Sequence, residues 1–271
     1  MEKYKTMDLT IAIVNYNTKN LVKYCVKNII SLNLPLSYQI IIIDNKSSDG
    51  SADFIEKHLI PRNNNVKLIR TSKNIGFGKG YNYGLKGVHC RYVLLINSDI
   101  IIQNDSIQNL YRFMEENEQC AIAGPKLVYP DQSVQQTFHR WPKMLTPIYR
   151  RTFLGKFSFG LRELKRYDMK ESDGSVPTSC DWVVGACMLI RKKIWDMVGG
   201  FDVRYFLYYE DIDICREVSA RGYEVWYYPD THIIHYHKRL SAGKKWWLTL
   251  FDKTARIHIA SHIKYFRKWG V

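Results

Sequence analysis

The sequence lacks three features that would each indicate a different class of protein. It has no apolar run near the ~20 residues that a membrane-spanning helix needs, and no early apolar stretch suited to a signal peptide. Its six cysteines form no Cys-x-x-Cys pair and lie at no zinc-finger spacing from a histidine. We therefore expect reduced core thiols in a cytoplasmic protein rather than a disulfide scaffold or a zinc module.

Acidic residues are too few to balance the basic ones. The 26 Asp and Glu stand against 40 Lys and Arg, which gives a formal net charge of +14. Two segments carry this excess: residues 138–170 hold nine basic and two acidic residues, and residues 238–271 hold nine and one. Such basic segments favour partners that carry phosphate, namely nucleic acid, anionic lipid headgroups or a phosphorylated substrate.

The arrangement of apolar residues predicts one large α/β domain. The 271 residues, 46% of them hydrophobic, are enough to bury a core. The first 125 residues alternate short apolar runs with helical patterns, which predicts a parallel, right-handed sheet. Residues 126–178 lose this regularity, so we expect loops and short elements there. From residue 244 to the end the pattern is helical, with one broad aromatic face. Five basic residues lie largely opposite that face: Lys253, Arg256, Lys264, Arg267 and Lys268.

Three apolar strands each end in a polar cluster. The clusters are Asn15, Tyr16 and Asn17 after residues 10–14, Asp44 and Asn45 after residues 40–43, and Asn97, Ser98 and Asp99 after residues 92–96. The carboxyl ends of parallel strands meet at one edge of a sheet, so these clusters predict a ligand crevice there. A buried carboxylate without a partner is costly, and a divalent cation held by a diphosphate would be a suitable partner.

A second cluster is formed by residues 208–213, Tyr-Tyr-Glu-Asp-Ile-Asp, with three carboxylates within four residues. Their mutual repulsion is expected to raise at least one pKa, which suits a general base. Acidic residues also complement the dipole at a helix N-terminus, so a purely structural role stays open. Further along, His235 and His237 alternate on a predicted strand, so only one of them can face the crevice as a metal ligand.

Residues 74–82, Asn-Ile-Gly-Phe-Gly-Lys-Gly-Tyr-Asn, form a glycine-bearing turn whose backbone can approach a nucleotide closely. The glycine spacing differs from Gly-x-Gly-x-x-Gly, and the run does not follow the first strand. A nicotinamide-dependent enzyme is therefore disfavoured.

Taken together and in this order, the motifs resemble the family-2 glycosyltransferases with the GT-A fold, and more narrowly their rhamnosyltransferase-like branch. The matching segments are residues 13–17, 43–51, 74–82, 95–99, 185–191, 199–202 and 206–213. The resemblance covers roughly residues 8–241 and implies a single fused Rossmann-like domain with a mostly parallel central sheet. The domain would occupy residues 1–243, with a nucleotide-sugar half at about 8–125 and an acceptor half at 126–243. A basic amphipathic helical tail would follow at 244–271.

The resemblance also implies a role for each matching residue. The donor-binding residues would be Asn15, Tyr16, Asn17, Asp44, Asn74, Gly76, Phe77, Asn82, Asn97, Ser98 and Asp99. Asp99 would hold Mg²⁺ or Mn²⁺ against the diphosphate, with His235 as a further ligand. Asp211 would be the base of a single inverting step, beside Glu210. The residues that meet the acceptor would be Trp182, Phe206 and Asp213, and Glu210 and Asp213 would also position the loop and helix around the base.

Two positions depart from the family's pattern. Asn97 stands where the family often has the first of two aspartates, which predicts weak metal binding with the nucleotide supplying most ligands. Residues 238–240, Lys-Arg-Leu, stand where the branch often has small residues, which leaves the choice between His235 and His237 open.

The resemblance predicts an inverting, metal-dependent hexosyltransferase for bacterial cell-surface polysaccharide, such as O-antigen or cell wall. The preferred donor is dTDP-rhamnose, and a UDP-sugar is the alternative. A non-catalytic nucleotide- or nucleic-acid-binding protein is a second alternative, although Asp44 and Asp99 would repel phosphate without a cation. Tryptophans among basic residues in the tail are typical of membrane-surface helices. We therefore expect peripheral docking on the inner face of the cell membrane, with a polyprenyl-diphosphate-linked glycan as acceptor. The alternative is a tail packed on its own domain.

Overall fold

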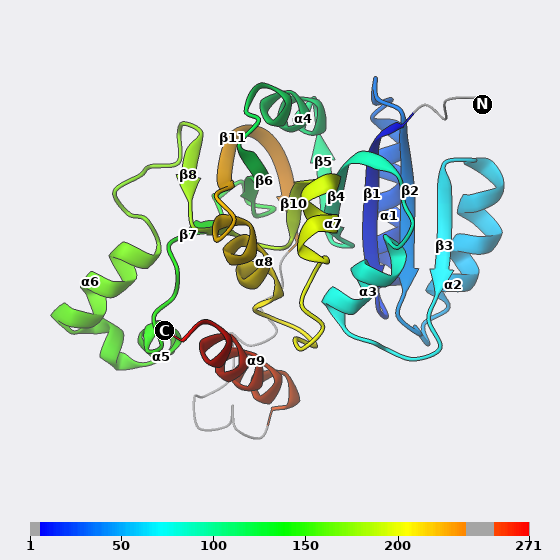
Figure 1. The fold of residues 1–271 in the computed structure, drawn as a ribbon. Helices are drawn as coiled ribbons and strands as arrows, with labels where there is room; N and C mark the ends of the chain where they lie inside the picture. Colours follow the sequence, from blue (N-terminus) through cyan, green and yellow to red (C-terminus); the bar gives the residue numbers. More distant parts are fainter. Residues whose placement is uncertain (1–5, 237–251, 271) are drawn as a thin grey trace.

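The computed structural model describes residues 6–236 and 252–270, which form an α/β fold around one large sheet (Figure 1). The sheet has nine strands in the order β3-β2-β1-β4-β10-β6-β11-β5, with β8 paired beside β11. Its strands are β1 (Met7–Asn15), β2 (Tyr38–Asp44), β3 (Val66–Arg70), β4 (Cys90–Asn97), β5 (Ile100–Gln103), β6 (Cys120–Val128), β8 (Thr178–Cys180), β10 (Cys187–Arg191) and β11 (Glu224–His235). A separate pair consists of β7 (Phe138–His139) and β9 (Trp182–Val183).

Helices cover both faces of this sheet. The helical elements are α1 (Lys19–Ser31), α2 (Ser51–Phe54), η1 (Ile55–Leu59), η2 (Ile60–Arg62), α3 (Phe77–Gly84), α4 (Ser106–Glu116), α5 (Thr146–Arg151), η3 (Phe153–Lys156), α6 (Ser158–Tyr167), α7 (Lys192–Val198), α8 (Glu210–Ser219) and α9 (Lys253–Trp269). Alternate residues of a strand point to opposite faces, so Ile11 and Ile13 pack with α1 and α4 while Ala12 packs with α3, α7, α8 and α9. Burial on both faces explains why these strands are apolar throughout.

The strand register brings the predicted polar clusters to one edge. Strand β1 runs parallel to both β2 and β4, with Asn15 opposite Asp44 and Val14 opposite Asn97. The first half therefore folds as the alternating pattern predicts. Strand β10 runs antiparallel between β4 and β6, and β5 and β8 run antiparallel to β11. The other six strands, β1, β2, β3, β4, β6 and β11, share one direction, so the sheet is mostly parallel.

The described part of the C-terminal segment belongs to the domain. Helix α9 places Tyr265 and Phe266 in the same buried cluster as α3, α7 and α8. This is the alternative that the sequence left open, a tail packed on its own domain, and it holds for residues 252–270. Residues 244–251, where the helix was predicted to start, lie outside the described residues.

Two further features of the described residues concern membrane spans and cysteines. No helix within 6–236 or 252–270 has both the length and the apolar character needed to cross a membrane. All six cysteines lie in the described chain as buried free thiols. Burial raises the pKa of the Cys25 thiol to about 12, as expected for an inert core residue rather than a nucleophile.

Candidate active site

The edge where β1 and β2 end is held by a network of short polar side chains. Asn15 Nδ2 donates to Asp44 Oδ1 at 2.7 Å, and it also lies 2.8 Å from Ser51 Oγ. The second carboxylate oxygen of Asp44 accepts from the Ser47 N–H at 3.0 Å. Asn15 is fully buried, so it does not line a nucleoside pocket as predicted. It instead fixes Asp44 and the turn after β2 from behind.

Tyr16 and Asn17 lie at the rim of the same edge. Both residues are exposed, and Asn17 adopts a left-handed backbone with φ of 54°. The Asn17 Oδ1 atom accepts from the Ser48 N–H at 2.7 Å, which connects this rim to the turn after β2. The exposed Tyr16 ring therefore remains available to stack on a nucleobase.

The glycine-bearing turn before α3 is held by contacts on two sides, from Asn45 after β2 and from the loop that precedes α8. The Asn45 side chain donates to the Gly76 carbonyl at 2.9 Å, and the Gly76 N–H donates to Asn74 Oδ1 at 3.0 Å. Gly76 has φ of +94°, and a Cβ atom there would lie 2.6 Å from the Phe206 carbonyl oxygen. Only glycine fits both constraints. The Phe77 N–H donates to that same Phe206 carbonyl at 2.9 Å, so a backbone hydrogen bond connects the turn to the loop that precedes α8.

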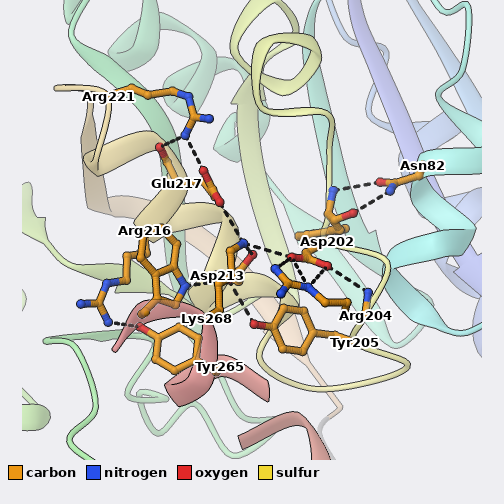
Figure 2. Close-up of polar contacts among 12 residues, drawn as sticks. Asn82, Asp202, Arg204, Tyr205, Asp213, Arg216, Glu217, Arg221, Tyr265 and Lys268 are labelled. Atoms are coloured by element: carbon orange, nitrogen blue, oxygen red, sulfur yellow. Dashed lines mark hydrogen bonds and ion pairs between the residues drawn. The ribbon is translucent and has the colours of Figure 1, made fainter. Parts of the chain in front are cut away.

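Asn82 has a different place from the one predicted for a donor ligand. Its amide donates to the Phe201 carbonyl at 2.7 Å and accepts from the Phe201 N–H at 2.9 Å (Figure 2). Both ends of the amide are thus used to join α3 to the loop after α7.

Asn45, which holds the Gly76 carbonyl, is a positioning residue. The sequence places it in the same polar cluster as Asp44, but no role was predicted for it.

The end of β4 brings Asp99 close to His235. Strand β5 follows Asp99 directly and pairs with β11, which places Ile100 opposite His235. Asp99 Oδ1 lies 3.4 Å from His235 Nε2. Nearby, Ser98 Oγ lies 2.9 Å from Thr18 Oγ1, and the Asn97 side chain is half-buried. The structure therefore brings together the two predicted metal ligands, while His237 lies outside the described residues.

Gln135 fixes which nitrogen of His235 faces Asp99. The Gln135 amide nitrogen lies within hydrogen-bond distance of two backbone carbonyls, those of Val128 at 3.2 Å and His235 at 3.0 Å. Its oxygen must then face His235 Nδ1, which lies 2.9 Å away and has to be the donor. In the neutral ring the lone pair is consequently on Nε2, directed at the Asp99 carboxylate. A lone pair aimed at a carboxylate is the arrangement that a cation between them would stabilise.

The predicted base lies at the start of α8. Asp211 Oδ2 accepts from the Gly185 N–H at 3.0 Å, and Oδ1 accepts from the Ile212 N–H at 2.9 Å. Burial raises the pKa of Asp211, while these two donors favour the ionised carboxylate. Burial, and then the charge of Asp211, raises the pKa of the buried Glu210 to about 8. Near neutral pH the pair therefore favours a protonated Glu210 beside an ionised Asp211.

A short connection joins Asp211 to the edge where β1, β2 and β4 end, which we call the donor edge after the ligand predicted there. Gly185 and Ala186 lie between β9 and β10; the first donates to Asp211, and the carbonyl of the second accepts from the Asn97 N–H at 2.9 Å. A Cβ atom on Gly185 would lie 3.0 Å from Asp211 Cβ. The absence of a side chain there lets α8 approach the edge, so a base and the end of β4 share one region.

The backbone immediately before the base is strained. Tyr208 and Tyr209 have φ values of 70° and 71°, a left-handed conformation that costs bulky residues about 1–3 kcal/mol each. Helix α9 holds this conformation, because the Tyr209 hydroxyl lies 2.8 Å from His262 Nδ1 and its ring contacts Tyr265. Such strain is typical of functional sites.

Asp213 lies in a buried ionic cluster rather than at an open surface. It is 1% exposed and accepts from Lys268 Nζ at 2.7 Å, Trp269 Nε1 at 2.8 Å and the Tyr205 hydroxyl at 3.1 Å (Figure 2). The predicted contact with an acceptor does not fit this placement, whereas the predicted positioning of α8 does.

Lys268 corrects a second expectation. It was predicted on the solvated face of the tail, but its Nζ lies within 3.0 Å of carboxylate oxygens from Asp202, Asp213 and Glu217. Helical periodicity identifies a polar face, and here part of that face meets acidic residues of the domain.

The two aromatic residues predicted to meet the acceptor differ in exposure. Trp182 is 6% exposed, its ring stacks on His139 at 4.7 Å, and its Nε1 donates to the Arg140 carbonyl at 3.1 Å. It has no open face for a sugar, so the structure does not support that contact. Phe206 is exposed on the loop that leads into α8. It can stack on a sugar, and its role stays a prediction.

Comparison with protein families agrees with this arrangement. The family model described as "Glycosyl transferase family 2" matches residues 10–196, more than half of the chain. The chain therefore belongs to glycosyl transferase family 2. The match includes the donor edge and ends before Asp211, so the base region rests on the geometry and on individual relatives.

Three relatives extend the similarity over most of the chain. "Rhamnosyltransferase WbbL" of Escherichia coli K12 is 28% identical over 263 residues, 94% of this chain and 91% of that protein. "N-acetylglucosaminyl-diphospho-decaprenol L-rhamnosyltransferase" of Mycobacterium tuberculosis is 26% identical over 246 residues, 87% and 75%. "dTDP-rhamnosyl transferase RfbF" of Shigella flexneri is 27% identical over 235 residues, 82% and 67%. These similarities place the chain in the rhamnosyltransferase-like branch of the family.

A solved structure shows the same fold. The mannosyltransferase PcManGT of Pyrobaculum calidifontis, in complex with GDP-Man and Mn²⁺, aligns with a TM-score of 0.63 at 14% identity. The alignment covers 97% of this chain and 65% of that one. The fold of this chain is the GT-A glycosyltransferase fold, as the sequence predicted.

Proposed function

We propose that this glycosyltransferase moves L-rhamnose from dTDP-rhamnose to a hydroxyl of a polyprenyl-diphosphate-linked glycan, with inversion at the anomeric carbon. The observation that carries the mechanism is the position of Asp211, oriented by two backbone N–H groups and joined through residues 185–186 to the end of β4. The names of two rhamnosyltransferase relatives support the proposal: one includes dTDP-rhamnosyl and the other a diphospho-decaprenol acceptor.

The proposed reaction is one displacement. The acceptor oxygen attacks the anomeric carbon while its proton passes to a carboxylate oxygen of Asp211. The bond between that carbon and the diphosphate oxygen breaks, and the nucleoside diphosphate leaves with the electron pair. A single attack from the opposite face inverts the centre, so one base suffices and no covalent intermediate forms. The protonated Glu210 keeps a second negative charge away from this base.

The donor base would lie over the edge formed by β1 and β2. Asp44 is positioned by Asn15 and Ser47 to accept from an imide N–H, and Tyr16 is exposed beside it. Thymine and uracil both carry that imide N–H. Asp44 therefore does not discriminate between them, and a UDP-sugar remains the alternative donor.

Asp99 and His235 fit a divalent cation. Their facing atoms, Oδ1 and Nε2, lie 3.4 Å apart, and Gln135 orients the imidazole. Among the described residues no cluster of three His, Cys, Asp or Glu side chains forms a metal site. The nucleotide diphosphate and water would supply the remaining ligands, as Asn97 in place of an aspartate also predicts. Bound Mg²⁺ or Mn²⁺ would offset the charge that develops on the leaving diphosphate.

The proposed acceptor implies a place of action. A lipid-linked glycan lies at a membrane. We therefore propose that the enzyme is cytoplasmic and makes peripheral contact with the anionic inner face of the cell membrane. Its product would enter a bacterial cell-surface polysaccharide. A nucleic-acid partner is disfavoured, because Asp44, Asp99 and Asp211 all lie at the edge where the ligand would bind.

Thermal stabilisation by dTDP, UDP and GDP, each with and without Mn²⁺, tests the donor site. A ligand that binds only the folded chain at 100 times its dissociation constant stabilises it by about 2.7 kcal/mol. We expect the largest increase in melting temperature with dTDP and Mn²⁺, and Asp99→Asn should remove the metal-dependent part alone. A preference for UDP would move the donor to a UDP-sugar. The absence of any shift would refute a nucleotide site at this edge.

A further inference from the structure

Residues 144–162 form a helical hairpin that presents an unusual number of apolar side chains to solvent. The hairpin consists of α5, η3 and the first half of α6 and lies at the outer edge of the molecule, beyond β7 and β8 (Figure 1). Its exposed apolar residues are Met144, Leu145, Ile148, Phe153, Phe157, Phe159 and Leu161. Phe153, Phe157 and Phe159 are 69%, 50% and 47% exposed, so most of each ring faces water. Clustered exposed apolar residues mark interaction surfaces.

The charges on this hairpin are of one sign. Its exposed charged residues are Arg150, Arg151, Lys156 and Arg162, flanked by Lys143 and Lys165. The neighbouring acidic residue, Glu163, is turned inward and is 7% exposed. Burial alone would raise the pKa of Glu163, but hydrogen bonds from Arg166 and Thr146 lower it to about 2. Glu163 therefore pairs with Arg166 inside the hairpin, and the exposed charges of residues 144–162 are all positive.

The hairpin is an ordered surface. Thr146 at the start of α5 donates to Glu163 Oε1 on α6 at 2.7 Å, and Arg166 joins Glu163 to the Trp141 carbonyl. The rings of Phe157 and Phe159 are nearly parallel, with centroids 5.8 Å apart. Internal bonds thus hold the two helices in a fixed geometry while the phenylalanines point outward.

We infer that this hairpin surface, residues 144–162, docks on an anionic lipid bilayer. Aromatic rings that enter the interface and cations that meet lipid phosphates are the combination by which interfacial helices bind membranes. A nucleic acid would use the cations but has no place for seven apolar side chains. The inference rests on the proposed function in one respect: a lipid-linked acceptor is the reason why the enzyme would dock on a membrane.

The hairpin also lies close to the C-terminal helix. Burial, followed by the charges of Arg151, His262 and Arg150, lowers the pKa of His258 on α9 to about 4, and Arg150 and Arg151 belong to α5. The basic hairpin therefore adjoins α9, whose aromatic residues Tyr265 and Phe266 are buried in the domain core. Within residues 252–270 these aromatic residues are used for packing, whereas the hairpin presents its aromatic rings to solvent.

Co-sedimentation of the full chain with vesicles tests this surface. The vesicles contain equal parts of phosphatidylglycerol and phosphatidylcholine, or phosphatidylcholine alone. We expect binding to the anionic vesicles and a decrease on the order of tenfold or more for the variant Phe153→Ser, Phe157→Ser, Phe159→Ser. The variant Lys156→Gln, Arg162→Gln should weaken binding by about fivefold for each charge. A matched control, Tyr24→Ser, Tyr83→Ser, Met197→Ser, removes three equally exposed apolar side chains elsewhere and should bind as the unmodified chain does.

Each outcome supports or overturns the inference. Equal binding to neutral vesicles, no binding at all, or unchanged binding of the phenylalanine variant would overturn it. Loss of binding in a Trp246→Ser, Trp247→Ser variant alone would assign the contact to the tail. A chain that self-associates through the phenylalanines without binding vesicles would make the hairpin a protein interface. All variants should keep the melting-temperature shift with nucleotide, because the hairpin contains no donor residue. A lost shift in the unmodified chain would instead refute the proposed function, leaving the vesicle result to stand.

Discussion

The donor edge and the α8–α9 region are built from different chemistry. At the donor edge, Asn15, Asp44 and Asn45 are fixed by amide, hydroxyl and backbone hydrogen bonds between residues near in space and in the same half of the chain. Around the base, Asp213 and Lys268 form an ionic cluster, and the partners come from residues 55 positions apart. The first region is held by groups that mostly do not titrate, and the second by groups that do.

This difference predicts where the protein responds to pH. The donor edge should keep its geometry over a wide pH range, because amides and hydroxyls do not change charge. Burial raises the pKa values of Glu210, Asp211 and Asp213. Hydrogen bonds outweigh burial and lower the pKa at two other carboxylates, at Asp202 from Arg204 and then Lys268, and at Glu217 from Lys268 and Arg221. Catalysis and the stability of α8 should therefore depend on pH more strongly than nucleotide binding does.

The largest effect is expected for Asp211→Asn. The amide keeps the shape of the side chain but cannot take the acceptor proton, so kcat should fall by about 10²–10⁴-fold. The Kd for dTDP should stay unchanged, because the donor edge does not use this carboxylate. Turnover with dTDP-rhamnose and a synthetic polyprenyl-diphosphate-linked acceptor, together with calorimetric binding of dTDP, measures both quantities. Asp131→Asn on an exposed turn is the control, and an active Asp211→Asn would remove Asp211 as the base.

Lys268→Met should produce the next largest effect, on stability. It leaves the carboxylates of Asp202, Asp213 and Glu217 without their shared cation, which should lower the free energy of unfolding by about 3 kcal/mol at neutral pH. Urea unfolding measures the loss. Lys264→Met on the same helix removes only one exposed hydrogen bond, to the Arg204 carbonyl, and should cost less than about 1 kcal/mol.

The same variant has a defined pH signature. The lowered pKa values of Asp202 and Glu217 mean that their stabilisation is present above the ordinary carboxyl pKa of about 4 and is lost as pH falls through the lowered values. The unmodified chain should therefore lose more stability on acidification than Lys268→Met. If acidification lowered the free energy of unfolding of the two proteins by equal amounts, the ionic explanation would be contradicted.

Gln135→Leu should weaken metal binding, although Gln135 is not one of the proposed metal ligands. It removes the acceptor that fixes His235 Nδ1, so Mn²⁺ affinity in the presence of dTDP should fall by about 10–100-fold. Electron paramagnetic resonance of free Mn²⁺ measures this affinity. Gln132→Leu is a matched control, because Gln132 Oε1, on the exposed turn after β6, makes the same type of contact with His232 Nε2 on β11. Equal losses in both variants would exclude a specific role for Gln135.

The smallest effect is expected for Glu210→Gln. An amide resembles the protonated acid, so kcat at neutral pH should change little. The raised pKa of Glu210, about 8, makes the folded chain bind more protons than the unfolded chain between about pH 4.5 and 8, so stability falls as pH rises through that range. The variant lacks this loss, so its stability relative to that of the unmodified chain should rise with pH across that range. Melting temperatures across that range test this, and a constant difference would contradict it.

The sequence predicted correctly that the ends of β1, β2 and β4 meet, because the signal there is local. A short polar residue after an apolar run marks a strand end, and parallel strands bring such ends together whatever the rest of the chain does. Asn15 and Asn82 were found, although their side chains are used for support rather than for the crevice. A single sequence does not separate a residue that lines a site from one that holds it.

The second half was harder to predict because its contacts are distant or irregular. Nothing local distinguishes Lys268, which meets three carboxylates, from an exposed lysine on the same helix. Trp182 carries no sign that its ring is stacked inside the domain. The hairpin has no buried apolar stripe to reveal its helices, since its apolar residues face outward.

The spacing between Asp213 and Lys268 has a consequence during synthesis. Translation at about 5–20 residues per second separates the two by roughly 3–11 s, because 55 positions lie between them. During that interval α8 has its carboxylates and the strained tyrosines before it, but lacks α9, the helix that holds them. We expect ribosome-bound chains stalled before α9 to leave this half unfolded and open to chaperones, while the nucleotide half is already formed.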